Sequence, residues 1–541
     1  MYDANTQYRH ACENRYRLFG NSFILHIAAE QRGSYRGRGG FNPGGSMSIL
    51  LTEKAKQHGD ATAIVAPEGT FSYRQLLEAS AGVATFLLKG ARDLEERPVT
   101  FLAPPGFHYV ALQWGIWRAG GIAVPLSLSH PRPELEYVIE DTAPAAVIAH
   151  PDLAARVEAI AAERGLRFAQ STDALEHPMG ALPEVATSRR AMILYTSGTT
   201  GRPKGVVTTH DNITAQIVSL CEAWEWTGDD RILEFLPLHH VHGIVNVISC
   251  ALWAGAVCEI IPEFDARKVW ERIVRGGLTL FMAVPTIYTK LIEAWQNSSP
   301  ADRRRMSEGC RGMRVMISGS AALPVSTLEK WREISGHVLL ERFGMTEIGM
   351  GLSNPLHGER YPGCVGTPLP GVEARLVDET GTPVAPGAPG EIEFRGRLVF
   401  SEYWRRPDDT RKAFRRGWFM SGDVAVIENG IYRILGRSSV DIIKTGGEKV
   451  SALEIEETLL THPDVRECAV VGVPDPVWGE KVCAALRLQS GKAMDTEALR
   501  AWGKQRLAPY KVPKDVAVVE QLPRNAMGKI IKPDVKKIFQ D

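Results

Sequence analysis

The sequence predicts an α/β protein with a large N-terminal domain of helix-covered sheets, a strand-rich subdomain and a small α+β domain at the C-terminus. Three observations support this prediction. From Met47 onwards, helical patterns alternate with short β-branched runs, as in parallel sheets covered by helices. After about residue 365 the chain changes to short β runs separated by turns. At 541 residues the chain is also too long for a single core.

The first elements after Met47 belong to the large domain. A helical pattern covers residues 72–80 and is followed by a predicted strand at 98–102. A second helix is expected from Tyr109 to Arg118, and a second strand at 121–125. Because strands alternate with helices, we expect the strands to lie parallel in one sheet.

The segment 191–210 carries a pattern suited to binding phosphate. An apolar run from Ile193 to Tyr195 predicts a buried strand, which ends abruptly in hydroxyls and glycines. These residues are Thr196, Ser197, Gly198, Thr199, Thr200 and Gly201. Glycines let backbone N–H groups approach phosphate oxygens, the hydroxyls add donors, and Lys204 adds positive charge. Lys204 is followed by Gly205, so this is not a Walker loop; the alternative interpretation is an ordinary polar turn.

The second half of the chain contains the strand-rich subdomain and the C-terminal domain. Short strands are predicted at 372–377, 390–394 and 417–423. A domain boundary is expected near 435–447, and Ser451 with Glu454 has the spacing of a capping box that opens a helix. A further strand is predicted at 468–472. The predicted domains are an extension and linker at 1–46, an N-terminal domain at 47–436 that includes the subdomain 365–436, and a C-terminal domain at 437–541.

Residues 1–46 differ from the rest, with six arginines, no lysine, three acids and a Gly-rich stretch at 33–40. Such a composition is typical of an extension followed by a linker. Two interpretations stay open: a mitochondrial presequence, although its acids and scarce serine fit poorly, or a true start at Met47. We therefore expect a cytoplasmic protein, or one of the mitochondrial matrix if the segment is a presequence.

Composition excludes several classes of partner. Lys plus Arg number 63, as do Asp plus Glu, so no global charge attracts nucleic acid or an anionic membrane. No apolar run approaches the roughly 18 residues of a membrane span. The eight cysteines show neither a Cys-x-x-Cys motif nor zinc spacing, which indicates a reducing compartment. The oligomeric state is left open.

Four further stretches, taken with the loop at 191–210, reveal a family resemblance. They are Phe343-Gly-Met-Thr-Glu347, Ser421-Gly-Asp423, Arg437, and Pro523-Arg-Asn-Ala-Met-Gly-Lys529. In this order they resemble the adenylate-forming superfamily of acyl-CoA synthetases, nonribosomal adenylation domains and luciferases, over roughly residues 48–535. The stretches 284–290, 341–350, 353–355 and 363–371 look like the malonyl-CoA synthetase branch, in the form also found in mitochondria.

The resemblance implies a two-step reaction in which a carboxylate and ATP give acyl-AMP and pyrophosphate, and CoA then displaces AMP. Malonate is the expected acid, with methylmalonate an open alternative. The loop from Thr196 to Gly201 and Lys204 would hold the β- and γ-phosphates. Thr346 would contact the α-phosphate, and Glu347 would hold Mg²⁺, which prefers oxygen ligands.

The same resemblance assigns the nucleoside and the second step. Asp423 and Arg437 would bind the ribose. Gly319, Ser320 and Ala321 would clamp adenine against the ring of Phe343, where many relatives carry Tyr. Lys529 would offset negative charge during adenylation and then leave by rotation of a mobile C-terminal domain about a hinge at Asp441. Gly446, Gly447 and Lys449 would line the CoA side.

The acid pocket must neutralise a second carboxylate if the substrate is malonate. We predict Arg314 as its main partner, because Arg offers a bidentate fork, and Lys290 as the second. His242 could donate to the same group, and Met345 completes the predicted pocket. The alternatives are that Arg314 caps a strand end and that Lys290 is solvated. His239, His240 and His242 do not form a zinc site, because no Cys or acid completes the set.

Two other functions stay open. One is a synthetase for another short-chain acid. The other is an adenylation enzyme that loads a carrier protein, or a catalytically dead binding relative. The chain contains no downstream carrier domain, and Lys204, Glu347 and Lys529 are all present, which disfavours the latter.

Overall fold

The computed structural model describes residues 49–196, 203–446, 448–524 and 530–540. The chain divides into two units, Met1–Gly45 and Ser46–Asp541, and the described residues all belong to the second. The predicted extension 1–46 lies outside the described residues, as do seven predicted site residues: Ser197, Gly198, Thr199, Thr200, Gly201, Gly447 and Lys529. The side chain of Lys449 lies outside them as well.

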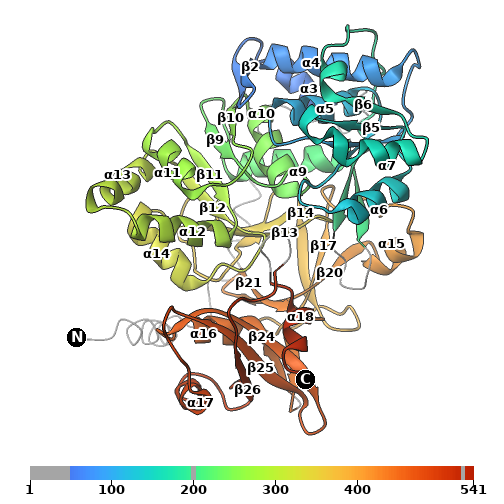
Figure 1. The fold of residues 1–541 in the computed structure, drawn as a ribbon. Helices are drawn as coiled ribbons and strands as arrows, with labels where there is room; N and C mark the ends of the chain where they lie inside the picture. The colour runs from blue at the N-terminus through green and yellow to red at the C-terminus, as the bar shows by residue number, and fades with distance from the viewer. Residues whose placement is uncertain (1–48, 197–202, 447, 525–529, 541) are drawn as a thin grey trace, which may run out of the picture. The chain divides into compact units, whose positions relative to one another are not determined.

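A seven-stranded sheet, of which Figure 1 labels β5 and β6, contains the two strands that flank the predicted phosphate-binding loop. Its order is β18-β8-β7-β4-β3-β5-β6, and the pairs among β3 to β7 are parallel, whereas β8 pairs antiparallel with both β7 and β18. The strands are β3 (Pro98–Leu102), β4 (Ile122–Pro125), β5 (Ala146–Ala149), β6 (Phe168–Gln170), β7 (Arg190–Thr196), β8 (Lys204–Thr209) and β18 (Glu402–Tyr403). The predicted strands at 98–102 and 121–125 are confirmed, the second beginning one residue later.

Helices cover this sheet, as the alternating pattern predicts. Ser72 caps α4 by accepting from the backbone N–H of Gln75, whose side chain returns a bond to Ser72. The predicted helix from Tyr109 is α5, which is buried along almost its whole length and packs on α4. The helices are α4 (Tyr73–Leu88), α5 (Phe107–Arg118), α6 (Arg132–Thr142), η1 (Pro151–Arg156), α7 (Glu158–Glu163) and α8 (Ser171–Leu175).

A nine-stranded sheet with the order β15-β14-β13-β12-β11-β9-β10-β1-β2 forms the second layer. The strands are β1 (Thr62–Ala66), β2 (Gly69–Ser72), β9 (Arg231–Glu234), β10 (Val257–Ile260), β11 (Leu280–Ala283), β12 (Val315–Ser318), β13 (Leu340–Met345), β14 (Gly349–Ser353) and β15 (Thr367–Pro368). Because β9 to β13 run parallel, their carboxyl ends share one edge of the sheet, where ligands bind in open α/β sheets. The α/β prediction is confirmed.

The helices of this second layer include a group, α11 to α14, that packs together beside β11 and β12 (Figure 1). The helices are α3 (Leu50–Lys56), α9 (His210–Ala223), η2 (His242–Ser249), α10 (Cys250–Ala254), α11 (Ala266–Val274), α12 (Pro285–Gln296), α13 (Pro300–Cys310) and α14 (Val325–Ser335). The η2 segment is a π-helix, a form often found at functional sites. No helix among the described residues is long and apolar enough to cross a membrane.

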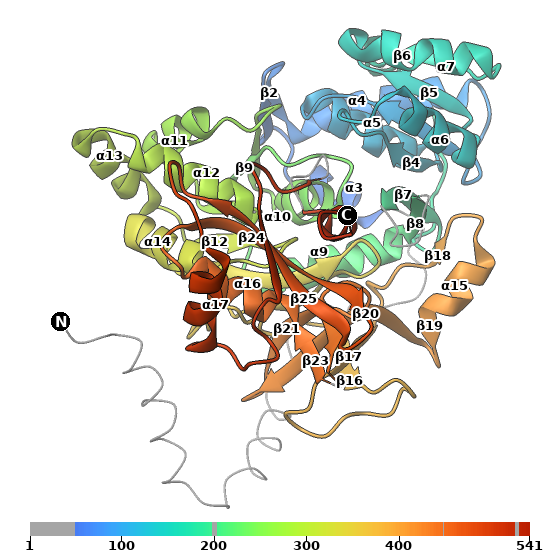
Figure 2. The ribbon, with the colours of Figure 1, turned by 60° about the horizontal axis from the view of Figure 1, so that its bottom comes forward.

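The strand-rich subdomain is an antiparallel sheet with the order β16-β17-β20-β19, and β21 also pairs with β20. Figure 2 shows β16, β17 and β20 together. Its elements are β16 (Glu373–Val377), β17 (Gly390–Arg395), α15 (Pro407–Ala413), β19 (Phe414–Arg415), β20 (Trp418–Glu428) and β21 (Ile431–Arg437). The strands predicted at 372–377, 390–394 and 417–423 are confirmed within a residue at each start. The register of β20 and β21 places Asp423 opposite Arg437.

The C-terminal domain is an α+β unit around a sheet of order β23-β22-β25-β24, with β26 paired to β25. Its elements are β22 (Ile442–Thr445), β23 (Glu448–Ser451), α16 (Ala452–Leu460), β24 (Val465–Asp475), β25 (Gly479–Leu488), α17 (Thr496–Lys504), β26 (Asp515–Val518) and α18 (Lys532–Lys537). The predicted capping box forms only in part: the Ser451 hydroxyl accepts from Glu454 N at 3.2 Å, but the Glu454 carboxylate accepts from Lys511 Nζ at 2.6 Å. The Glu454 side chain therefore does not accept from the backbone N–H of Ser451, because its carboxylate is paired with Lys511.

Candidate active site

The two strands that flank the phosphate-binding pattern form an antiparallel hairpin. Thr196 is the last residue of β7 and lies opposite Lys204, the first residue of β8. The Lys204 ammonium lies 3.1 Å from the Asp409 carboxylate and 5.3 Å from the centre of the Tyr403 ring. The hairpin thus holds a partly buried cation at the exit of the predicted loop, where a phosphate oxygen could replace Asp409 as its partner.

Glu347 lies buried in the turn between β13 and β14, next to the partly buried Thr346. The Tyr403 hydroxyl donates to its Oε1 at 3.0 Å. Burial raises the pKa of Glu347, while the Tyr403 hydrogen bond and the positive charges of Arg437 and Lys204 lower it. Two predicted residues from distant parts of the sequence, Lys204 and Arg437, therefore act on the Glu347 carboxylate.

Tyr403 was not predicted as a site residue. It lies in β18, a two-residue strand with no motif of its own, which reaches the site only because it pairs with β8. Its hydroxyl orients Glu347, and its ring lies beside Lys204. No local pattern in the sequence could have identified it.

Asp423 and Arg437 meet across the β20–β21 hairpin. The Arg437 guanidinium lies 3.3 Å from the Asp423 carboxylate, which is 6 % exposed. The Ser421 hydroxyl accepts from the backbone N–H of Asp423 at 3.1 Å and donates to the Ile392 carbonyl. The two residues predicted to bind one sugar are thus brought together by strand register.

The turn after β12 and the end of β13 lie at the carboxyl edge of the second sheet. Ser320 has a left-handed φ of +69°, an unusual conformation for a residue with a side chain. Phe343 is partly buried, and its ring stacks at 6.0 Å on Phe394. Gly319 and Ala321 flank Ser320, so the predicted clamp residues share this edge with the β13 strand that carries Phe343.

His242 opens the π-helix η2 and is 5 % exposed. Its Nδ1 lies 3.3 Å from the Ser320 hydroxyl. Burial, and next the positive charge of Arg342, hold the pKa of His242 well below its usual range, so the ring is neutral. Met345, the last residue of β13, is partly buried against the core of the strand-rich subdomain.

The structure contradicts the predicted role of Arg314. Its Nε and Nη2 donate to the two oxygens of Asp230, each at 2.8 Å, and its Nη1 donates to the Trp224 carbonyl. Arg314 and Asp230 each precede a parallel strand, β12 and β9, so both lie at the amino edge of the sheet. Four strand residues, about 13 Å, separate Arg314 from the carboxyl edge where Ser320 lies.

Lys290 does not enter the candidate site either. It is an exposed residue of α12, with its ammonium 5.8 Å from the centre of the Phe264 ring. For each predicted partner of the second carboxylate the alternative interpretation therefore holds: Arg314 lies at a strand end, and Lys290 is solvated.

Replacing Arg314 with methionine is expected to lower the free energy of unfolding by about 3 kcal/mol, because Asp230 would stay buried without its cation. Denaturant titration of the purified variant measures this. Combining Arg314→Met with Asp230→Asn should restore part of the loss, since no charge is then left unpaired. Unchanged stability of the single variant would show that the ion pair is not structural.

The predicted hinge residue Asp441 is held by a buried ion-pair network. Its Oδ1 lies 2.6 Å from Lys532 Nζ, and the same ammonium lies 2.7 Å from Glu456. Its Oδ2 accepts from the backbone N–H of Arg437 at 3.0 Å, and its own N–H donates to the Arg437 carbonyl. Asp441, which follows the strand-rich subdomain, is thereby tied to helix α18 through Lys532.

Lys532 and Glu456 were missed by the sequence analysis, although one signal existed. Glu456 lies three or four positions from Ala452 and Leu459 and next to Ile455, all buried on one face of α16. An acid on an apolar helical face needs a buried cation. Gly446, predicted for the CoA side, has a left-handed φ of +58° and donates its N–H to the Trp478 carbonyl.

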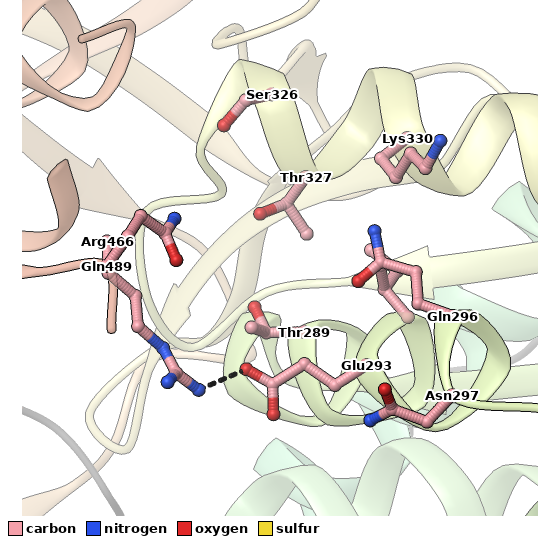
Figure 3. Close-up of a pocket in the computed structure, with 10 residues that line it drawn as sticks. Thr289, Glu293, Gln296, Asn297, Ser326, Thr327, Lys330, Arg466 and Gln489 are labelled. Carbon is pink, nitrogen blue, oxygen red and sulfur yellow. Dashed lines mark hydrogen bonds and ion pairs between the residues drawn. The ribbon is translucent and has the colours of Figure 1, made fainter. Parts of the chain in front are cut away.

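A polar cavity of about 430 Å³ lies beside α12 and α14 (Figure 3). Arg466, from β24, donates to Glu293 on α12 at 2.6 Å across it. Its other lining residues are Thr289, Ile292, Gln296, Asn297, Ser326, Thr327, Lys330 and Gln489. None of the predicted site residues lines this cavity.

Comparison with known proteins gives consistent matches over most of the chain. Residues 51–404 match the family described as AMP-binding enzyme, and residues 454–529 match the C-terminal domain of the same enzymes. Malonate–CoA ligase ACSF3, mitochondrial, of Mus musculus is 44% identical over 530 residues, covering 91% of each chain. Malonate–CoA ligase of Arabidopsis thaliana is 39% identical, covering 89% of this chain and 87% of its own.

Among solved structures, ATP-bound MatB from Rhodopseudomonas palustris superposes with a TM-score of 0.85 at 35% identity. The match covers 91% of this chain and 99% of MatB. A complex of an anthranilate–CoA ligase with anthranoyl-AMP gives a TM-score of 0.81 at 26% identity.

Proposed function

Because the chain belongs to the family of AMP-binding enzymes, we propose that it joins malonate to coenzyme A in an ATP-dependent reaction. Malonate is first converted to malonyl-AMP with release of pyrophosphate, and the CoA thiol then displaces AMP to give malonyl-CoA. The protein is accordingly an AMP-forming acid–thiol ligase. Methylmalonate is a second candidate acid of the same reaction.

The observation that carries this proposal is the similarity to proteins named malonate–CoA ligases in animals and plants. These relatives are 39% to 45% identical, and each match covers about nine-tenths of both chains. Each match is long enough to include both the nucleotide-binding residues and the acid pocket. The similarity therefore does not depend on isolated motifs. The ligase relatives with other acids in their names, such as a feruloyl-CoA synthase at 33%, are less similar.

The proposed nucleotide site has Lys204 and the loop from Thr196 at the β- and γ-phosphates and Thr346 at the α-phosphate. Adenine binds between the Gly319–Ala321 turn and Phe343, and Asp423 with Arg437 binds the ribose. The 3.3 Å contact between Asp423 and Arg437 supports their acting on one sugar. Lys204 and Arg437 both stabilise the charged form of Glu347, which supports a single cluster around the phosphates.

Glu347 fits the proposed role of a magnesium ligand. Mg²⁺ is usually bound through one or two carboxylates together with phosphate oxygens and water, so one buried carboxylate beside the phosphate site suffices. No group of three or more potential metal-ligating side chains occurs within the described ranges. When bound with ATP, Mg²⁺ would neutralise charge on the departing pyrophosphate. The Tyr403 hydroxyl keeps Glu347 oriented toward that position.

For the second half-reaction we propose that the C-terminal domain turns about Asp441, which removes Lys529 and brings Gly446, Gly447 and Lys449 to line the CoA side of the pocket. Two chemistries in one pocket require two arrangements, because the adenylation lysine blocks the path of the thiol.

The mitochondrial names of the animal relatives favour the matrix over the cytoplasm, and we extend the proposal to residues 1–46 as the targeting segment.

A substrate panel tests the proposal. With ATP, Mg²⁺ and CoA, we expect AMP release to be fastest with malonate, slower with methylmalonate, and weak with acetate and octanoate. AMP release measured by coupled assay, with the thioester identified by mass spectrometry, gives kcat/KM for each acid. Preference for acetate or octanoate would contradict malonate as the substrate, and transfer to a carrier protein but not to CoA would contradict the ligase.

A further inference from the structure

Two residues of the helix α6, Tyr137 and Asp141, contact the chain on both sides of the predicted phosphate-binding loop. The Tyr137 hydroxyl donates to the carbonyl of Pro203, the residue before β8, at 2.7 Å. The hydroxyl of Tyr195, near the end of β7, donates to Asp141 Oδ2 at 2.5 Å. One helix therefore holds the chain where it enters the loop and where it leaves it.

The position of α6 is set by the core of the first sheet and not by the loop. Its residues Leu135, Val138 and Ile139 are buried in one cluster with side chains of the strands β3, β4 and β5. Tyr137 and Asp141 are only partly buried, and because they are four residues apart they lie one above the other on the helix surface. Both ends of the loop are thereby joined to a fixed part of the domain.

The stretch that follows β18 supports both residues from the other side. Arg406 Nη2 donates to the Tyr137 hydroxyl at 3.1 Å and lies 3.6 Å from Asp141 Oδ1. Trp404 Nε1 donates to the Asp141 carbonyl at 3.1 Å. Tyr137 and Asp141 are therefore themselves held in place, by the same short stretch that brings Tyr403 to Glu347.

The ring of Tyr195 is also fitted to this place. Strand register puts Tyr195 opposite Gly205, where an added Cβ would lie 3.2 Å from the Tyr195 ring, so only glycine leaves it enough room. The Tyr137 ring meets the Tyr195 ring edge-on at 6.0 Å. Burial, and next the hydrogen bond to Asp141, raise the pKa of Tyr195, so its hydroxyl keeps the proton that it donates.

Backbone N–H groups serve a phosphate only when neighbouring residues hold them within about 0.5 Å of the productive geometry. The pairing of β7 with β8 joins the two ends of the loop to each other, whereas α6 joins both ends to the core. We propose that Tyr137 and Asp141 are positioning residues, which hold the loop where it receives the β- and γ-phosphates of ATP. This inference rests on the proposed function and adds residues outside the loop that act on this part of the nucleotide alone.

Replacing Tyr137 with phenylalanine removes one hydroxyl and is expected to raise KM for ATP, and KM for pyrophosphate in the reverse reaction, about tenfold. The affinity for AMP and the rate of thioester formation from malonyl-AMP should not change, because neither ligand carries β- and γ-phosphates. Asp141→Ala should act in the same way, whereas Asp141→Asn keeps an acceptor for Tyr195 and should give a smaller rise. Pyrophosphate release at varied ATP, ATP formation from malonyl-AMP at varied pyrophosphate, and calorimetry with AMP measure these effects.

Tyr73→Phe is the matched control, because the Tyr73 hydroxyl of α4 also donates to a backbone carbonyl, that of Ala256, at 2.7 Å. It should leave both KM values unchanged. Wild-type KM values in both Tyr137→Phe and Asp141→Ala would overturn the inference. So would an equal loss of affinity for ATP and AMP, which would mean that the two residues only support the fold. A wild type that releases no pyrophosphate with malonate and ATP would instead refute the proposed function itself.

Discussion

Replacing Lys529 with alanine is expected to slow formation of malonyl-AMP by about 10²-fold or more, while thioester formation from supplied malonyl-AMP and CoA keeps most of its rate. In-line attack at the α-phosphorus gathers negative charge on the carboxylate and phosphate oxygens. A compact ammonium placed there stabilises the transition state more than the ground state, so its loss lowers kcat. In the proposed mechanism the thiol attacks a carbonyl after the lysine has left, so the rate of this step should not depend on that charge.

Two separate measurements check this prediction. Pyrophosphate release with malonate and ATP reports the first half-reaction, and malonyl-CoA formation from malonyl-AMP reports the second. Lys537→Ala is a suitable control, because it removes an exposed cation from α18, in the same part of the chain. Equal losses in both half-reactions of Lys529→Ala would mean that the residue is needed for folding or for both steps, and the proposed timing would fail.

Replacing Asp441 with proline is expected to slow one half-reaction by about 10²-fold relative to the other, since proline fixes φ and costs about 3 kcal/mol in an unsuited conformation. A domain that must occupy two orientations needs a residue whose backbone can change between them. The substitution also removes the hydrogen bond from Asp441 N to the Arg437 carbonyl. The same pair of assays, run on purified full-length protein, measures the effect on each step.

The structure shows why this experiment needs a second variant. Asp441→Pro also breaks the ion pair with Lys532, which holds the same carboxylate at 2.6 Å. Asp441→Ala breaks that pair but leaves φ free, so it should slow the two steps to a similar extent. The difference between the two variants isolates the backbone. If the proline and alanine variants gave the same ratio of half-reaction rates, Asp441 would be a structural residue and the hinge would lie elsewhere.

Local pattern predicted most of the fold correctly. The helix that Ser72 caps, the strand 98–102 and the three strands of the subdomain all begin within a residue of their predicted starts, although the helix and the last strand run further than predicted. Each depends on periodicity and capping, which act over a few neighbouring residues. The capping box at Ser451 formed only in part, because Lys511, distant in sequence, took the Glu454 carboxylate. Tyr403 had no signal, since pairing of β18 with β8 alone brings it to Glu347.

The sequence by itself predicted the fold class, and its resemblance to the adenylate-forming family singled out Lys204, Glu347, Asp423 and Arg437, because those residues lie in the stretches that carry the resemblance. It could not decide on which edge of the sheet each arginine lies. Arg314 and Arg342 both lie beside apolar β runs and look alike in sequence. Only the tertiary structure gives Arg314 its partner Asp230, 84 residues earlier, at the amino edge of the sheet. Arg342 is instead buried near the carboxyl edge, and its Nε and Nη2 have no hydrogen-bond partner among the described residues, because the pairing of strands, and not the local sequence, decides what surrounds each arginine.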